Sequence, residues 1–432
     1  MTPISYRAVV LCALVTVPDV LFAQAGPSME SGHEWTLEEV VEAVAIGHPQ
    51  VQAAQARVDA AAGARRTAGA WTNPVFTHWI ENSAFSLRGA PPGLDRESST
   101  YATVPLEPLF QRPARVQRAD QDLAAARADV IATHRQLSLE AARAFFRVAL
   151  AQIALDTASE NRAALDRLAE YNRARVSQGA AAEVELMRVQ IEIDRAVLDA
   201  AVADAELARA RVELKRFLGS RAPADLTDLR VSTAPAALIP DAPLPALSSL
   251  LNVARTQRPE VAAARARIDA AAAETDYQRR LLVRQVGATV GFKQSAGTSS
   301  LIAGITLPLP LFDRNAGEVQ RTTGERVAAE REMEALGHAI ETEVESAYQA
   351  AQRLSAALGG SPRTFVERAT ELQRLTVAAY QEGGATLLQV LDATRTLSDA
   401  RFTYFRTAFA ARESLIELSI ASGDAPLQNR TK

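Results

Sequence analysis

The side chains that most often carry chemistry are few in this sequence and widely separated. Five histidines are present, and they show no spacing typical of metal ligands. They are His33, His48, His78, His134 and His338. The one cysteine, Cys12, lies in an apolar N-terminal stretch, so neither a disulfide nor a thiol nucleophile is expected. We predict a protein that is not an enzyme, has no cofactor and holds no metal ion of its own.

Polar and charged residues instead gather around two glycine-containing turns, near 179 and 383. The first turn is followed by Glu183, Glu185 and Arg188, and the second is preceded by Tyr380. Glu183 and Glu185 would fall in the first turn of a helix, where the helix dipole favours solvated carboxylates without any further role. The pair Gly383-Gly384 lacks the pattern of a phosphate-binding loop and does not follow a strand.

The same turns expose small residues, which would let the tip of a partner helix approach the backbone closely. These residues are Gly179, Ala180, Gly383, Gly384 and Ala385. The alternative is that each glycine only reverses the chain direction at a helix end. Both roles can hold at one turn.

Composition excludes several classes of protein. The 432 residues are 48% hydrophobic and 23% charged, with a net charge of −4. Such a chain lacks the basic stripe of a nucleic-acid-binding protein and is too apolar for general disorder. After the N-terminus no run of 18 apolar residues occurs, which excludes a bundle of transmembrane helices.

The N-terminus has the features of an export signal. Arg7 precedes an apolar stretch over 8–17, and Ala23-Gln24-Ala25 is a small-x-small cleavage site. We predict a signal peptide over 1–25. Leu11 before Cys12 is too large for a typical lipoprotein site, so no lipid anchor is expected.

The mature chain contains an internal repeat. His48-Pro49-Gln50-Val51 returns as Arg258-Pro259-Glu260-Val261, and Leu109-Phe110-Gln111-Arg112 returns as Leu311-Phe312-Asp313-Arg314. The first repeat is predicted over 26–219, with strands at 73–82 and 99–109, a long helix at 113–177 and a shorter one at 181–218. After a proline-rich linker at 220–245, the second covers 246–421, with strands at 285–296 and 299–309 and helices at 316–382 and 385–421. A tail follows at 422–432.

The long helices carry apolar residues seven apart, which predicts coiled-coil packing. One such series in the helix after the first turn is Val184, Ile191, Leu198, Ala205 and Val212. A helix over 113–177 would be ~100 Å long, too long for a globular core, so we expect helical hairpins to pack beside copies of themselves. The helix over 316–382 should bend near 359–362, because a proline interrupts it.

The four strands alternate in polarity and are about the length of tilted membrane-spanning strands. Aromatic residues near their ends could form a girdle at the membrane surface. These are Trp71, Trp79, Tyr101, Phe110 and Phe312. Four strands cannot close a barrel, and open edges are not tolerated in lipid, so other copies of the chain would have to complete the wall. Ordinary soluble hairpins are the alternative.

The sequence resembles the TolC-type outer-membrane efflux protein family, and within it the heavy-metal-efflux branch typified by CzcC and CusC. The residues that carry the resemblance are the junction 306–317, the turn around Tyr380-x-x-Gly383 with Val390-Leu391-Asp392-Ala393, and the start Trp35-Thr36-Leu37 followed by His48-Pro49. The resemblance implies a mainly α fold with a small β part. Three chains would form a helical barrel and a twelve-stranded transmembrane β-barrel in the outer membrane of a Gram-negative bacterium. Loop 83–98 and the turn at Gly297 would face the cell exterior.

The resemblance also implies partners and a site. The homotrimer would sit in outer-membrane lipid and dock, through the turns near 179 and 383, on a periplasmic adaptor bound to an inner-membrane RND pump. No nucleic acid is involved. The turns would form a closed aperture, for which the candidates are Glu185, Asp392, Gln389, Glu183, Arg188 and Tyr380. Gln389 stands where many members carry a carboxylate, and Ala385 where some carry a basic residue.

The function expected from the resemblance is an outer-membrane exit duct that exports heavy-metal cations. The same channel could instead serve drug efflux or protein secretion. A soluble periplasmic coiled-coil scaffold would also explain the export signal and the seven-residue repeats. It does not explain the four alternating strands at matched places in the two repeats.

Overall fold

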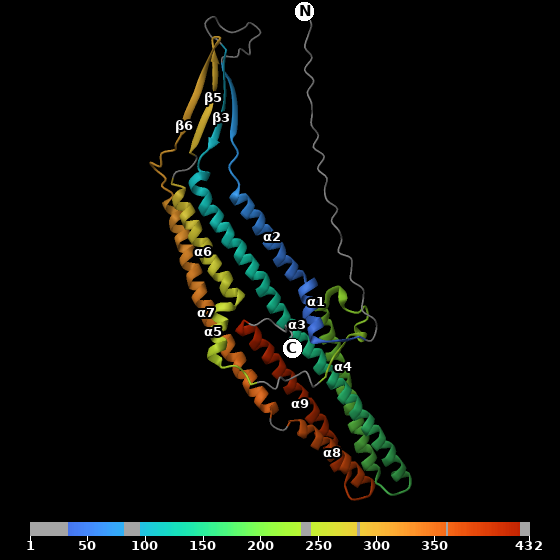
Figure 1. The fold of residues 1–432 in the computed structure, drawn as a ribbon. Helices are drawn as coiled ribbons and strands as arrows, with labels where there is room; N and C mark the ends of the chain where they lie inside the picture. The colour runs from blue at the N-terminus through green and yellow to red at the C-terminus, as the bar shows by residue number, and fades with distance from the viewer. Residues whose placement is uncertain (1–32, 82–95, 235–242, 283–285, 360–361, 424–432) are drawn as a thin grey trace, which may run out of the picture.

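The structure, a computed structural model, describes residues 33–81, 96–234, 243–282, 286–359 and 362–423. The predicted signal peptide, most of loop 83–98 and most of the tail lie outside this part of the chain. The molecule is long and narrow, with a β-sheet at one end, two helical turns at the other, and a hydrophobic core between them (Figure 1).

Each repeat contributes a helical hairpin whose turn lies at the end far from the sheet. The first repeat has β1 (Glu34–Trp35), α1 (Leu37–Gly47), α2 (Pro49–Gly69), β2 (Val75–Glu81), β3 (Glu97–Pro105), α3 (Pro108–Ser177) and α4 (Glu183–Leu218). Short 3-10 turns at Gly219–Arg221 and Leu226–Asp228 lead to β4 (Arg230–Val231). The second repeat has α5 (Leu247–Gln257), α6 (Pro259–Arg280), β5 (Gly287–Ser295), β6 (Thr298–Thr306), α7 (Ala316–Gly359), α8 (Pro362–Gln381) and α9 (Leu387–Ser422).

Several element bounds differ from the predicted ones. The strand predicted at 99–109 ends at Pro105, because Pro108 begins α3 and the amides of Phe110 and Gln111 already bond to the carbonyl of Glu107. Pro108 suits this position, since a proline at the first helical residue loses no hydrogen bond. The predicted single helix over 316–382 is two helices, α7 and α8. They end and begin on either side of 360–361, which lie outside the described residues.

The sheet has the strand order β2-β3-β5-β6, and every neighbouring pair is antiparallel. Its two faces differ in chemistry. Three rows of cross-strand neighbours are mainly apolar: Phe76, Ala102, Val290 and Ala303; Thr100, Phe292 and Leu301 with His78; and Val104, Ala288 and Ile305. We call this the apolar face. The outer strands β2 and β6 each have one neighbour within the described chain.

The opposite face of the sheet is mostly polar. Thr103 Oγ1 lies 3.0 Å from Thr289 Oγ1, and Lys293 Nζ lies 2.5 Å from Glu97 Oε2. Trp79 and Tyr101 are on this polar face, because they alternate with the apolar-face residues. These two of the aromatic residues considered for a girdle are therefore not on the apolar face of the sheet.

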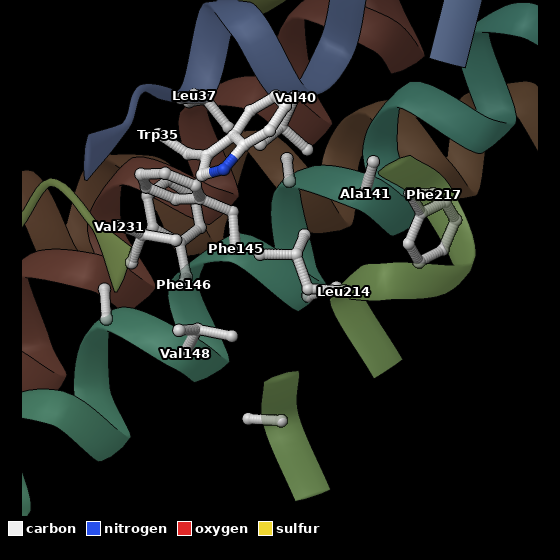
Figure 2. Close-up of a cluster of buried hydrophobic side chains, with 14 of the residues drawn as sticks. Trp35, Leu37, Val40, Ala141, Phe145, Phe146, Val148, Leu214, Phe217 and Val231 are labelled. Carbon is white, nitrogen blue, oxygen red and sulfur yellow. The ribbon is translucent and has the colours of Figure 1, made fainter. Parts of the chain in front are cut away.

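The hydrophobic core lies where the start of the chain meets the middle of α3 and the ends of α4 and α9. Figure 2 shows Trp35, Phe145, Phe146 and Val231 packed together with residues of α1 and α4. Phe146 stacks on Phe409 of α9, with ring centroids 5.7 Å apart. Large aromatic side chains dominate the burial energy of such cores, so this cluster joins both repeats.

Part of the predicted linker belongs to this core. β4 pairs in parallel with β1, with Trp35 opposite Val231. The Gln152 side chain of α3 bonds to both the amide and the carbonyl of Val231, each at 3.0 Å. The stretch 220–245 is therefore partly ordered structure and not only a spacer, although 235–242 lie outside the described residues.

The seven-residue series predicted in α4 faces away from its own chain. Val184, Ile191, Leu198 and Val212 are about three-fifths to two-thirds exposed. α4 packs on α3 through a second series with the same spacing, in which Val189, Ala196, Ala210 and Phe217 are buried. The helix thus carries one apolar seam inside the chain and another on its surface.

Candidate functional site

The two turns at the end far from the sheet have the same backbone geometry. Gly179 and Gly383 adopt φ of 71° and 82°, in the left-handed region that favours glycine. The amide of Ala180 bonds to the carbonyl of Arg175 at 2.8 Å, and the amide of Gly384 bonds to that of Ala379 at 2.8 Å. Because the same hydrogen bond recurs in both repeats, the hairpins α3–α4 and α8–α9 end in two turns of matching geometry, which we call the tips.

A hydrogen-bond network of buried polar groups links the two tips. The Tyr380 hydroxyl of α8 donates to Asn172 Oδ1 of α3 at 2.6 Å and accepts from Arg175 Nη1 at 3.1 Å. Tyr380 is 4% exposed and Asn172 is 0% exposed. Burial raises the pKa of Tyr380, so the phenol stays protonated and able to donate.

Aromatic contacts reinforce this network. The rings of Tyr171 and Tyr380 meet edge to face with centroids 5.8 Å apart, and the Arg175 guanidinium lies 5.4 Å from the centroid of the Tyr380 ring. The Tyr171 hydroxyl donates to the carbonyl of Gln381 at 3.3 Å. Arg175 also donates to the carbonyl of Ala180 at 3.2 Å, so one side chain contacts both hairpins.

Glu185 is at the edge of this network. Its Oε2 lies 4.0 Å from Arg175 Nη1 and 3.5 Å from the Tyr380 hydroxyl. Since the Tyr380 proton is directed to Asn172 at a much shorter distance, the Glu185 contact is mainly an attraction to Arg175. The Glu185 side chain is 40% exposed, so water weakens that attraction.

Asp392 and Gln389 lie in a different place, along a shallow groove between α8 and α9. The groove is also lined by Leu372, Leu375, Thr376, Ala379, Gly384, Ala385 and Ala393. Gln389 Oε1 accepts a bond of 2.8 Å from the amide of Thr386, and the Thr386 hydroxyl accepts from the amide of Gln389. This capping box fixes the start of α9, so Gln389 has a local structural role. Asp392 is exposed.

The remaining candidates are on the surface. Glu183 and Arg188 are exposed on α4, and Ala180 and Gly384 are exposed at the tips. Ala385 is half-buried against the apolar cluster that Leu165, Val189, Tyr380 and Val390 form beneath the tips. The structure thus brings Glu185 and Tyr380 together, and places Asp392 and Gln389 in the separate groove.

Sequence reasoning did not identify Asn172, Arg175 or two ion pairs that join the hairpins. Arg395 of α9 pairs with Glu192 of α4, and Arg401 of α9 pairs with Glu160 of α3. The hydrogen bond to Glu192 raises the pKa of Arg395. The spacing of Tyr171 and Arg175, one helical turn apart just before Gly179, was the available signal for the network.

Metal ligands are not gathered in the part of the chain that the structure describes. No group of three or more His, Cys, Asp or Glu side chains there could hold a metal ion. His48 caps α2 through Nδ1, which accepts from the amide of Gln50 at 3.3 Å. Among the same residues, no helix has both the length and the apolar character needed to cross a bilayer.

Solved structures with a similar fold include membrane channels. The structure of CusC has a TM-score of 0.73 at 20% identity and covers 94% of this chain and 99% of CusC. The open state of the MtrE outer membrane channel of Neisseria gonorrhoeae has a TM-score of 0.73 at 19% identity and covers 94% and 96% of the two chains. These likenesses confirm the predicted fold class, mainly α with a small β part.

Sequence comparison gives relatives over similar lengths. The cobalt-zinc-cadmium resistance protein CzcC of Cupriavidus metallidurans is 26% identical over 382 residues, which cover 87% of each chain. The nickel and cobalt resistance protein CnrC of the same organism is 31% identical over 289 residues, 65% of each chain. The family described as outer membrane efflux protein matches residues 40–220 and 250–424, the two repeats. With both repeats matched and the fold shared, this chain belongs to the outer membrane efflux protein family.

Proposed function

We propose that three copies of this chain form the exit duct of a tripartite system that exports heavy-metal cations. Membership of the family confirms the prediction of a non-enzymatic efflux protein, and family members work with an adaptor and an inner-membrane pump. Family membership also favours a channel over a periplasmic scaffold. The trimer, the particular partners and the cargo of this chain are what we propose.

The observation that carries the duct is the sheet. One face is apolar, the other is mostly polar, and β2 and β6 each lack a second neighbour within the described chain. In lipid such edges would leave backbone groups unsatisfied. Pairing β2 of one copy with β6 of the next would satisfy them and put the apolar face toward lipid and the polar face around water.

The helices support the same arrangement. Beyond the exposed series on α4, Met187 and Val202 are also more than half exposed on that helix. On α8, Phe365, Leu372 and Leu375 are about half exposed. Leu372 follows Phe365 by seven residues, and Leu375 follows Leu372 by three. Apolar stripes at heptad spacing are the surfaces that coiled coils bury. A second copy of the chain is a partner that would cover both.

The metal cargo is proposed from the relatives. CzcC and CnrC are named for resistance to cobalt, zinc, cadmium and nickel, and CzcC aligns over most of both chains. A duct needs only weak contact with its cargo, so we assign the choice of ion to the pump. The matched tips near Gly179 and Gly383 are the proposed contact with the periplasmic adaptor.

The test of the cargo is a deletion in the organism that encodes the chain. Cells without it should become sensitive to cobalt, zinc or cadmium salts, and the intact gene should restore growth. A variant with Ile191→Asp and Leu198→Asp, which charges the exposed seam of α4, should fail to restore it. Sensitivity to apolar drugs with unchanged metal tolerance would favour the drug-efflux alternative and contradict metal export.

A further inference from the structure

The segment between β6 and α7 exposes an unusual run of apolar side chains. We call residues 307–315 the β6–α7 connector; it lies where the sheet meets the helices (Figure 1). Leu307, Leu309 and Leu311 are 54%, 69% and 68% exposed, and Phe312 is 101% exposed. Leaving four large apolar side chains in water is unfavourable compared with burying them.

These leucines continue the apolar face of the sheet. Leu301, Ala303 and Ile305 of β6 are on that face, and Leu307, Leu309 and Leu311 keep the same two-residue period. Leu301 and Ile305 are 79% and 77% exposed. The apolar surface therefore does not stop where the strand ends at Thr306.

The apolar stretch of β6 is shorter than the apolar band of a membrane barrel, and the connector can extend it. From Leu301 to Ile305 the strand rises ~13 Å, and less when tilted. The outward apolar band of a membrane barrel is about 25 Å tall. A fully extended chain from Ile305 to Leu311 would add at most ~20 Å, and the turn between Leu309 and Leu311 shortens this; the connector thus extends the apolar surface toward the height that a bilayer needs.

The connector is held in place by the helices beneath it. Asn315, with φ of 61°, donates from Nδ2 to the backbone carbonyl and to Oε1 of Gln278 on α6 at 2.7 and 2.9 Å. Pro308 and Pro310 lack amide donors, and the Leu311 amide bonds to the carbonyl of Leu309 at 2.9 Å. The two prolines and this bond reduce the number of backbone donors that the segment would carry into lipid, which lowers the cost of such a position.

The first repeat presents the same feature. Leu109, which corresponds to Leu311 in the internal repeat, is 63% exposed at the start of α3. The Phe110 carbonyl beside it accepts from Arg280 Nη1 at 2.8 Å. Each chain thus carries an exposed leucine at both junctions between strand and helix.

We propose that the β6–α7 connector lies in the periplasmic leaflet of the outer membrane, with Leu309, Leu311 and Phe312 in contact with phospholipid acyl chains. The proposal rests on the membrane position of the sheet given above. Asp313 and Arg314, both exposed, follow at once and mark the level of the headgroups. A neighbouring copy would pair with the backbone edge of β6, which leaves side chains on the sheet's faces uncovered.

The test places a fluorescent probe at single cysteines in the full-length protein. Cys12 is the sole cysteine of the chain, so a Cys12→Ser background leaves one labelling site. Phe312→Cys is the test position, and Leu301→Cys on the sheet reports the barrel itself. Gly337→Cys on α7 is the control in water, because an added Cβ there meets nothing within 4 Å. Each labelled protein is reconstituted in phospholipid vesicles that contain lipids spin-labelled on the acyl chain.

We expect the probe at 312 to emit at shorter wavelength than the probe at 337. We also expect the spin-labelled lipid to quench the probes at both 312 and 301. A quenched probe at 301 with an unquenched, water-like probe at 312 would overturn the connector proposal and leave the barrel standing. A shifted but unquenched probe at 312 would place the connector against another copy of the chain and also overturn it. If neither 301 nor 312 is quenched, the membrane position of the sheet fails.

Discussion

The Tyr380 hydroxyl lies 2.6 Å from Oδ1 of Asn172, so a side chain of α8 satisfies a fully buried amide oxygen of α3. The two helices come from different repeats, and their contact lies about two turns from the first tip and one turn from the second. This hydrogen bond between buried neutral groups joins the two hairpins at the proposed aperture, together with the ion pairs Arg395–Glu192 and Arg401–Glu160.

Replacing Tyr380 with Phe should loosen the contact between the tips. Asn172 Oδ1 would lose its short hydrogen bond while it stays buried, which costs about 1–3 kcal/mol. We expect a higher single-channel conductance in planar bilayers and a lower melting temperature. Tyr404→Phe on α9 is the matched control. Equal conductance and melting temperature in the two variants would show that the Tyr380 hydroxyl does not restrain the tips.

Asp392→Ala tests the expectation that Asp392 lines the aperture. Three copies of an exposed carboxylate around a pore favour cations and can constrict it. The variant should lose part of its preference for cations over anions or conduct more, measured as reversal potential and conductance. Asp399→Ala, on the same helix face but two turns further from the tip, should change both quantities less. If Asp392→Ala conducts and selects as the unmodified protein does, Asp392 is not an aperture residue.

Bulky side chains at the tips test adaptor docking. Ala180→Phe should leave the trimer intact, since Ala180 is exposed, but should prevent close approach of a partner helix and so lower metal export in cells. Ala385→Phe tests the second tip, although its half-buried site makes a check of folding necessary. Ala208→Phe, exposed and far from the tips, is the control. Unimpaired metal export by an intact Ala180→Phe trimer would argue against docking at this turn.

His48 should make stability depend on pH. Burial lowers the pKa of His48 below its ordinary value of 6.5, and the nearby Arg216 lowers it further. As the pH falls, His48 is protonated more readily in the unfolded chain than in the folded protein. The contribution of His48 to the free energy of unfolding is therefore complete above about pH 6.5 and decreases at lower pH. Protonation also removes the Nδ1 acceptor that caps α2, a loss of about 1 kcal/mol. His48→Asn keeps a capping oxygen without titrating, and its melting temperature should fall less between pH 7.5 and 5.5. An equal fall in both proteins would assign the pH effect to other groups.

Long-range order was predictable where a pattern repeats, and fine contacts were not. The matched pairs around Leu109 and Leu311 locate both junctions, and the glycines at 179 and 383 locate both turns. The series beginning at Val184 was predicted to be a coiled-coil seam, yet it is exposed within the chain, and its spacing is the same as that of the buried series beginning at Val189. Which of two equal periodicities is covered within one chain depends on tertiary packing, which local sequence does not specify.

The tip network shows the same limit. Glu185 and Tyr380 were proposed as separate candidates, and the structure joins them through Arg175 and Asn172, which come from a third helix. Gln389, considered as a substitute for a carboxylate, caps its own helix. The spacing of Tyr171 and Arg175 places them on one face of their helix, but it does not say which side chains of the other repeat they meet, whereas a capping box is complete within one short segment.

The central claim is that three copies of the chain complete one duct. The most direct measurement is native mass spectrometry of the folded protein, extracted from outer membranes in mild detergent. The account predicts a trimer, and it predicts that the Ile191→Asp, Leu198→Asp variant shifts the population toward monomer. A monomer released without detergent would contradict both the shared barrel and the membrane position of the sheet.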